Sequence, residues 1–116
     1  KTKEECVAAG VPKENVLVVQ GEITDEAALK KIVDETVARF GQIDVLINNA
    51  GAAVPTTTPF LEETSSDHFD KTMAINAKSS IRLSQIAASH LIKTNGAIVN
   101  ISSIVGLPLA VDVNAD

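Results

Sequence analysis

One stretch decides the fold of this chain: Asp44-Val45-Leu46-Ile47-Asn48-Asn49-Ala50-Gly51. Its short apolar run ends in two amides and a glycine, which is typical of a buried, parallel strand. Ala50 and Gly51 remove side-chain bulk where a ligand could approach the backbone. In open α/β sheets, ligands bind outside the carboxyl ends of the strands, so this strand end is a candidate binding site. The alternative is a strand that stops in an Asx-type turn.

Upstream of this stretch, helical and extended patterns alternate. Residues 1–9 are typical of the last turns of a helix that Gly10 ends. The β-branched run Val16 to Val19 predicts a buried strand. A second helix is expected to begin after an N-cap at Thr24 or Asp25 and to end at the next glycine. Apolar residues recur on one face of this helix at spacings of three and four: Leu29, Ile32, Val33, Val37 and Phe40.

Downstream, a loop over residues 52–64 precedes a long helical pattern. The pattern has N-cap candidates at 64–66 and runs to about Lys93, as two helices that meet at an angle or as one kinked helix. Residues 97–101 predict a third strand, and a loop follows over residues 104–116. The alternation of helices and strands predicts an α/β fold with a parallel sheet.

The composition narrows the classes of function. The chain has 116 residues, which suits one domain, and its net charge of −5 with no basic cluster argues against a nucleic-acid partner. Cys6 is the single cysteine, so an internal disulfide is excluded and a reducing intracellular compartment, such as the cytoplasm, is expected. We find no signal peptide, no transmembrane run and no cluster typical of a metal site. The absence of an initiator Met suggests a fragment or a processed chain.

Four motifs in order carry a family resemblance. The stretch Asn48 to Gly51, the helical Asn76 and the segment 96–103 resemble the classical short-chain dehydrogenases/reductases, and residues 20–25 resemble that family's Asp-Val-Thr-Asp region. The resemblance implies a Rossmann-like, doubly wound parallel sheet that binds NAD or NADP. The three predicted strands would then be the third, fourth and fifth of that sheet.

The resemblance also implies the cofactor-binding residues. Asn49, Ala50 and Gly51 would lie along the ribose of the cofactor, while Asn48 would brace the strand by bonding neighbouring backbone groups. Glu22 stands where the family has an adenine-contacting Asp, and it is one methylene longer. Its alternative is a solvated loop carboxylate. Beside it, Ile23 would pack against the adenine ring.

Two residues carry the implied catalytic roles. Ser103 matches the family's catalytic Ser, whose hydroxyl can polarise a substrate carbonyl, and the adjacent Ser102 is the alternative. Asn76 matches the helix Asn that helps to hold a water in a proton relay. Its amide would need partners if buried, and at a kink it could satisfy freed backbone groups. The alternative is an ordinary polar position in a long helix.

Two parts of the family's machinery are absent from the 116 residues. The chain has no Tyr, so it lacks the acid–base motif Tyr-x-x-x-Lys, and no Gly-rich phosphate turn precedes its strands. The domain over residues 1–116 is therefore expected to be an incomplete NAD(P)-binding unit. In the doubly wound order, Val16 to Val19 would also lack its neighbouring strand. We expect the chain alone to be unstable or rearranged, and inactive.

Two hypotheses about function follow. In the first, the chain is the central part of an NAD(P)-dependent oxidoreductase that transfers hydride between the nicotinamide and an alcohol or carbonyl substrate. In the second, it is a truncated, non-catalytic relative that acts at most as a binding or dimerisation module. For both, the resemblance implies a homo-oligomer formed through the helix from Asn76 to Lys93.

Overall fold

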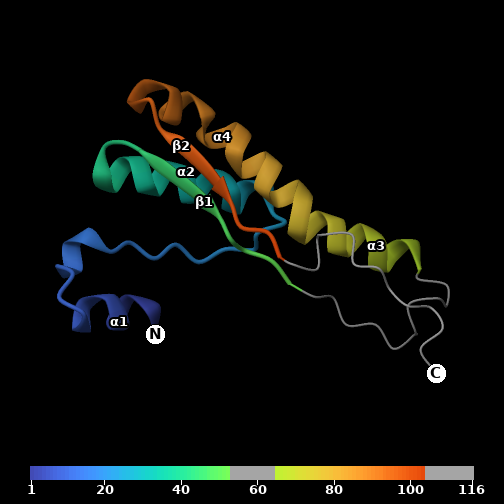
Figure 1. The fold of residues 1–116 in the computed structure, drawn as a ribbon, viewed down its shortest axis with the longest axis horizontal. Helices are drawn as coiled ribbons and strands as arrows, with labels where there is room; N and C mark the ends of the chain where they lie inside the picture. The colour runs from blue at the N-terminus through green and yellow to red at the C-terminus, as the bar shows by residue number, and fades with distance from the viewer. Residues whose placement is uncertain (53–64, 104–116) are drawn as a thin grey trace.

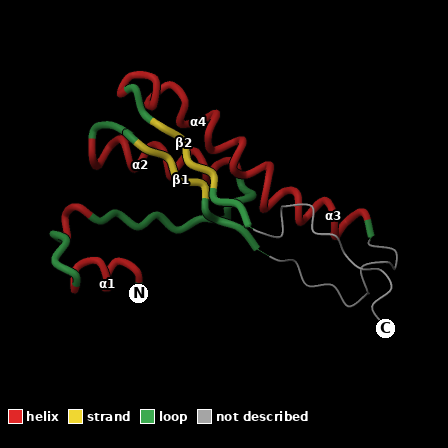
Figure 2. Tube along the Cα trace, in the orientation of Figure 1, coloured by secondary structure: helices red, strands yellow, loops and turns green. Residues whose placement is uncertain are grey.

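The computed structural model describes residues 1–52 and 65–103. Residues 53–64 of the loop predicted over 52–64, and the whole loop predicted over 104–116, lie outside the described residues. Figure 1 shows the elements, and Figure 2 separates helices from strands along the same trace. In chain order they are α1 (Thr2–Ala8), the 3-10 turn η1 (Lys13–Asn15), α2 (Glu26–Phe40), β1 (Val45–Asn48), α3 (Ser66–Met73), the π-helical turn η2 (Ala74–Lys78), α4 (Ser79–Thr94) and β2 (Ala97–Asn100).

The two strands form a parallel pair, as the sequence predicts. Val45 pairs with Ala97 and Asn48 with Asn100, so both strands end at the same edge of the sheet. The helical segment from α3 to α4 makes the crossover between them. A parallel pair requires such a crossover, because a tight turn cannot return the chain to the same starting edge. The predicted α/β fold with a parallel sheet is confirmed.

Helices α2 and α4 lie side by side against one face of the sheet (Figure 1). The apolar stripe of each helix supplies the core, together with one residue just before β1. Burying such stripes is the main favourable contribution to folding here. The buried cluster consists of Leu29, Val33, Ile43, Leu83, Ala87 and Leu91.

The predicted ends of α2 are confirmed. Asp25, rather than Thr24, is the N-cap, because its carboxylate accepts a hydrogen bond from the backbone N–H of Ala27 (3.1 Å). Gly41 ends the helix with φ of 86°, a left-handed conformation that glycine adopts without strain. Glycine also ends the α1 region, where Gly10 has φ of 95°.

The long helix is continuous, with a π-helical turn in its middle. Ser65 caps its start by accepting a hydrogen bond from the N–H of His68 (3.2 Å), and Asn95 ends it with φ of 52°. Directly after the π turn, the hydroxyl of Ser79 donates to the carbonyl oxygen of Ile75 in the turn (2.5 Å). A serine that bonds the preceding turn in this way often accompanies a bend. The sequence predicts two helices that meet at an angle or one kinked helix, and the structure has one continuous helix with a π turn in it.

The strand predicted at Val16 to Val19 is wrong. The segment leaves η1 extended, with φ of −124° and ψ of 112° at Val16, but it forms no ladder with any described residue. It runs apart from β1 and β2 and is drawn as a loop in Figure 2. Strand formation depends on a partner edge, which the local β-branched pattern cannot supply.

The sheet face opposite α2 and α4 is open among the described residues. Side chains that share this face are well exposed, at 53% for Val45, 59% for Ile47 and 42% for Val99. Such an apolar patch is a candidate contact surface in a folded protein. None of the helices in residues 1–52 and 65–103 is long and apolar enough to cross a bilayer.

Candidate active site

A cleft of about 860 Å³ lies where β1 and β2 end, beside the π turn. The two strand ends form one wall, and the helix from η2 into α4 forms the other. This is the position at which open α/β sheets bind ligands. Fourteen residues line the cleft: Asn48, Asn49, Ala50, Gly51, Ala52, Asn76, Ala77, Ser80, Ile81, Ser84, Asn100, Ile101, Ser102 and Ser103.

The cleft brings together most of the predicted site residues. Asn49, Ala50 and Gly51 are exposed and enter it directly from β1. Ser102 and Ser103 enter it from the end of β2, and both are exposed. The segment Asn49 to Gly51 and the two serines therefore line the same cleft. This geometry does not distinguish Ser103 from Ser102 as the catalytic serine.

Asn76 links the π turn to the backbone that follows β1. Its Oδ1 accepts a hydrogen bond from the N–H of Ala52 (2.9 Å), and its Nδ2 donates to the carbonyl oxygen of Ala52 (2.9 Å). A Cβ on Gly51 would lie 2.8 Å from Oδ1 of Asn76, so a glycine is needed for this close approach. A π turn interrupts the helix at Asn76, but the Asn76 side chain bonds the loop rather than the freed helix backbone. Ser79 is the residue that bonds the helix backbone.

Asn48 braces the strand ends through side chains instead of the backbone groups that we expected. Its Nδ2 donates to Oγ of Ser84 (3.0 Å) and to Oδ1 of Asn100 (2.8 Å). Asn48 is 6% exposed, which makes this a buried polar contact at the floor of the cleft. Satisfied buried amides of this kind favour a single arrangement of the elements that they join.

The Glu22 region lies beside the cleft and does not line it. Ile23 is half-buried and shares a small adjoining cavity of about 40 Å³ with Asn49 and Ala50. Glu22 is exposed, and its Oε1 accepts a hydrogen bond from the hydroxyl of Thr24 (3.4 Å). The carboxylate is therefore bonded locally within its own loop.

Sequence reasoning missed several lining residues, and a signal for them existed. Asn76, Ser80 and Ser84 recur every four residues, which places their polar side chains on one helical face. Asn100 ends its strand opposite Asn48 in the parallel register. Reading polar positions along the helix and across the pair would have found these residues.

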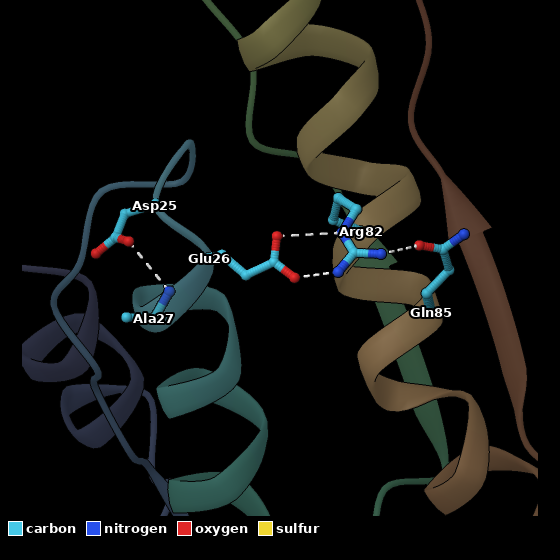
Figure 3. A network of polar contacts seen from close by, with 5 residues as sticks. All are labelled: Asp25, Glu26, Ala27, Arg82 and Gln85. Carbon is cyan, nitrogen blue, oxygen red and sulfur yellow. Dashed lines mark hydrogen bonds and ion pairs between the residues drawn. The ribbon is translucent and has the colours of Figure 1, made fainter.

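The resolved pKa shifts in the described part of the chain lie outside the cleft. Glu26 at the start of α2 and Arg82 on α4 form an ion pair across the two helices, and Gln85 accepts a further bond from Arg82 (Figure 3). The hydrogen bonds from Arg82 hold the pKa of Glu26 below its ordinary value, and the positive charge of Arg82 acts in the same direction. Among the described residues, no group of three His, Cys, Asp or Glu side chains gathers to hold a metal ion.

Comparison with known proteins decides the family. The family model described as short chain dehydrogenase matches residues 1–113. The chain belongs to the short-chain dehydrogenase family. L-fucose dehydrogenase of Rattus norvegicus is 38% identical over 106 residues, which cover 90% of this chain and 38% of the relative. The chain thus spans about two fifths of the length of that relative.

Solved structures of the family share the fold. A short-chain dehydrogenase/reductase of unknown function from Caenorhabditis elegans, solved with cofactor, matches with a TM-score of 0.88 at 36% identity, covering 95% of this chain and 41% of that one. ElxO with NADP bound matches with a TM-score of 0.73 at 36% identity, covering 91% and 43%. The predicted Rossmann-like fold class is confirmed.

Proposed function

We propose that the complete protein is an NAD(P)-dependent oxidoreductase that transfers hydride between a nicotinamide and an alcohol or carbonyl carbon of a small molecule. The observation that carries this proposal is the meeting of two strand ends at one cleft, with Asn49 to Gly51 on one and Ser102 to Ser103 on the other. Family membership supports the same reaction class.

The cleft fits a dinucleotide cofactor in size and chemistry. Its volume of about 860 Å³ falls in the usual range for small-molecule sites. The exposed amide of Asn49 offers donors and acceptors for ribose hydroxyls, and Ala50 and Gly51 leave the backbone accessible. NADP bound to ElxO and the cofactor of the Caenorhabditis elegans structure support NAD or NADP as the ligand class.

Ile23 and Glu22 are proposed to contact the adenine end of the cofactor. Ile23 shares a cavity with Asn49 and Ala50, which supports a continuous binding surface from the cleft to this loop. Glu22 would have to exchange its bond with Thr24 for one to the adenosine portion, a small change for an exposed side chain.

Ser103 is proposed to hold the reacting oxygen. Its hydroxyl would donate a hydrogen bond to the substrate oxygen and so favour the charge that develops there. When bound, the cofactor supplies or accepts the hydride. The amide nitrogen of Asn76 carries two hydrogens, of which the bond to Ala52 uses one, and the second is proposed to hold a water of the proton relay.

The 116 residues alone are proposed to be inactive. They contain no Tyr, so the acid–base residue that the family resemblance implies is not among them. The small sheet of two strands and the exposed apolar face formed by Val45 and Ile47 support the proposal that residues 1–116 are not a complete cofactor-binding domain. A non-catalytic binding module remains the alternative to an oxidoreductase.

Turnover by the full-length protein tests the proposed function. With NADH, NADPH and a panel of carbonyl compounds, Ser103→Ala should lower kcat by about a hundredfold, as loss of an oxyanion-type donor does, with little change in cofactor affinity. Ser102→Ala is the matched control and should retain most turnover. Near-normal turnover of Ser103→Ala would remove Ser103 from this role, and absence of any turnover by the unaltered full-length protein would favour the binding module.

The helix from Asn76 to Lys93 is proposed to form a homo-oligomer interface in the full-length protein. Ile92 on this helix is 76% exposed and Ile81 is 58% exposed, which supports a further contact there. Ile92→Glu should shift the mass in analytical ultracentrifugation from oligomer to monomer, and Asn15→Glu, at an exposed position outside this helix, is the control for added charge. An unaltered protein that sediments as a monomer would refute the proposal.

A further inference from the structure

Three elements meet at the buried amide of Asn48. Its two Nδ2 hydrogens reach Ser84 on α4 (3.0 Å) and Asn100 at the end of β2 (2.8 Å). The main-chain carbonyl oxygen of Asn48 also accepts a hydrogen bond from the N–H of Ile101 (2.9 Å). Both donors of the amide are therefore engaged within the protein, as a buried amide requires.

This contact lies directly behind the groups proposed to do the chemistry. Asn48 immediately precedes Asn49, and Asn100 lies three residues before Ser103. A shift of either strand end would change the distance between Asn49 and the hydroxyl of Ser103. Reacting groups must be held to within roughly half an ångström for efficient transfer, so such a shift lowers the rate before it unfolds the protein.

We propose that Ser84 is a positioning residue of this cleft, whose hydroxyl orients the Asn48 amide and thereby holds the ends of β1 and β2 in their working spacing. The identity of the reacting groups rests on the proposed function. Ser84 acts from α4, which packs against both strands. It does so through Asn48 and does not need to touch the substrate.

The physical reason lies in the cost of an unpaired donor. Without the hydroxyl of Ser84, one N–H of the buried Asn48 side-chain amide has lost its acceptor. The amide must then rotate toward another acceptor or admit water. Either change disturbs its second bond, to Asn100, because one planar group carries both hydrogens.

Kinetics of the full-length protein test the proposal. Ser84→Ala should lower kcat by about tenfold, the equivalent of one hydrogen bond, while KM for the cofactor stays within about twofold. Ser84→Thr keeps the hydroxyl and should restore most of kcat. Ser66→Ala, at an exposed serine at the start of α3 and outside the cleft, is the matched control. A kcat for Ser84→Ala within twofold of the unaltered protein, or no recovery with Thr, would overturn the proposal.

A double mutant separates positioning from general loosening. Asn100 is exposed, so Asn100→Ala should fold, and it removes the other acceptor of the same amide. If both residues act through Asn48, the loss of kcat in Ser84→Ala with Asn100→Ala should be less than the product of the single losses. If the double mutant loses kcat by the product of the two single losses, the two residues do not act through the same amide of Asn48.

Hydrogen exchange provides a readout that needs no turnover. In Ser84→Ala, the N–H of Ile101 should exchange about tenfold faster. Its acceptor is the main-chain carbonyl oxygen of Asn48, and the end of β1 that carries this oxygen is no longer held by Ser84. The N–H of Gly41, which donates to Val37 at the end of α2, should be unchanged. If the full-length protein transfers no hydride, the proposed function fails while this measurement still decides the positioning role. Unchanged exchange at Ile101 would overturn it.

Discussion

The side chain of Asn76 and the backbone of Ala52 form a two-point contact. Oδ1 accepts from the N–H and Nδ2 donates to the carbonyl oxygen, each at 2.9 Å. Asn76 sits in the π turn of the long helix, and Ala52 follows the strand-end stretch Asn49 to Gly51. The contact therefore ties the helical wall of the cleft to its strand wall, 24 residues away in sequence.

Removal of this contact should weaken catalysis in the full-length protein. Asn76→Ala loses two hydrogen bonds worth about 1 kcal/mol each, so we expect kcat to fall by roughly thirtyfold. Asn76→Asp keeps the acceptor for the N–H of Ala52 and loses the donor. Its kcat should lie between those of the unaltered protein and Asn76→Ala. Steady-state kinetics at 25 °C measures both variants. Turnover of Asn76→Ala equal to that of the unaltered protein would show that the contact is dispensable.

A side chain on Gly51 should displace Asn76. The added Cβ of Gly51→Ala would lie 2.8 Å from Oδ1 of Asn76, closer than real Cβ contacts allow. We expect the variant to lose about 1–3 kcal/mol in free energy of unfolding, as overpacking does. In an Asn76→Ala background the same change should be nearly neutral, because the clashing group is gone. Chemical denaturation of the four proteins checks this, and an equal cost in both backgrounds would contradict it.

The Glu26–Arg82 ion pair should raise the free energy of unfolding at neutral pH, and this stabilisation should be lost as the pH falls. Because the folded state holds the pKa of Glu26 below its ordinary value near 4.5, the pair stabilises the fold above that value. The contribution disappears as the pH falls through the lower, folded-state pKa. Above pH 5, the stability difference between the unaltered protein and Arg82→Gln should therefore be constant, and below about pH 4.5 it should shrink.

Thermal unfolding from pH 3 to pH 7 measures this difference. Lys93→Gln, which removes an exposed positive charge from the same helix, is the control for net charge. The effect should be small, because both partners are well exposed at 39% for Arg82 and 61% for Glu26. A difference that grows as the pH falls would mean that the pair does not act as described.

Local sequence patterns predicted the parts of the fold that depend on local interactions. The caps at Asp25 and Ser65 and the terminator Gly41 act within a few residues, so they can be read from the chain. The strand β1 was predicted from an apolar run bounded by turn formers. Its pairing with β2 followed from the alternation of elements.

Long-range partners could not be read in the same way. Val16 to Val19 has a strand-like composition, yet a ladder needs a neighbouring edge, and this segment pairs with none among the described residues. The partner of Asn76 is 24 residues away in sequence. The two partners of Asn48, Ser84 and Asn100, are 36 and 52 residues away. Residue type showed that these amides would need partners, but only the fold shows which groups they meet.

Binding of nicotinamide cofactors to the full-length protein tests the central claim most directly. Isothermal titration with NADH and NADPH should show that at least one of them binds, and that Asn49→Leu weakens this binding by about tenfold or more, as loss of a well-placed polar contact does. Asn15→Leu, at the exposed end of η1, should bind as the unaltered protein does. If neither cofactor binds the folded protein, or if Asn49→Leu binds with unchanged affinity, the cleft at the ends of β1 and β2 is not the cofactor site.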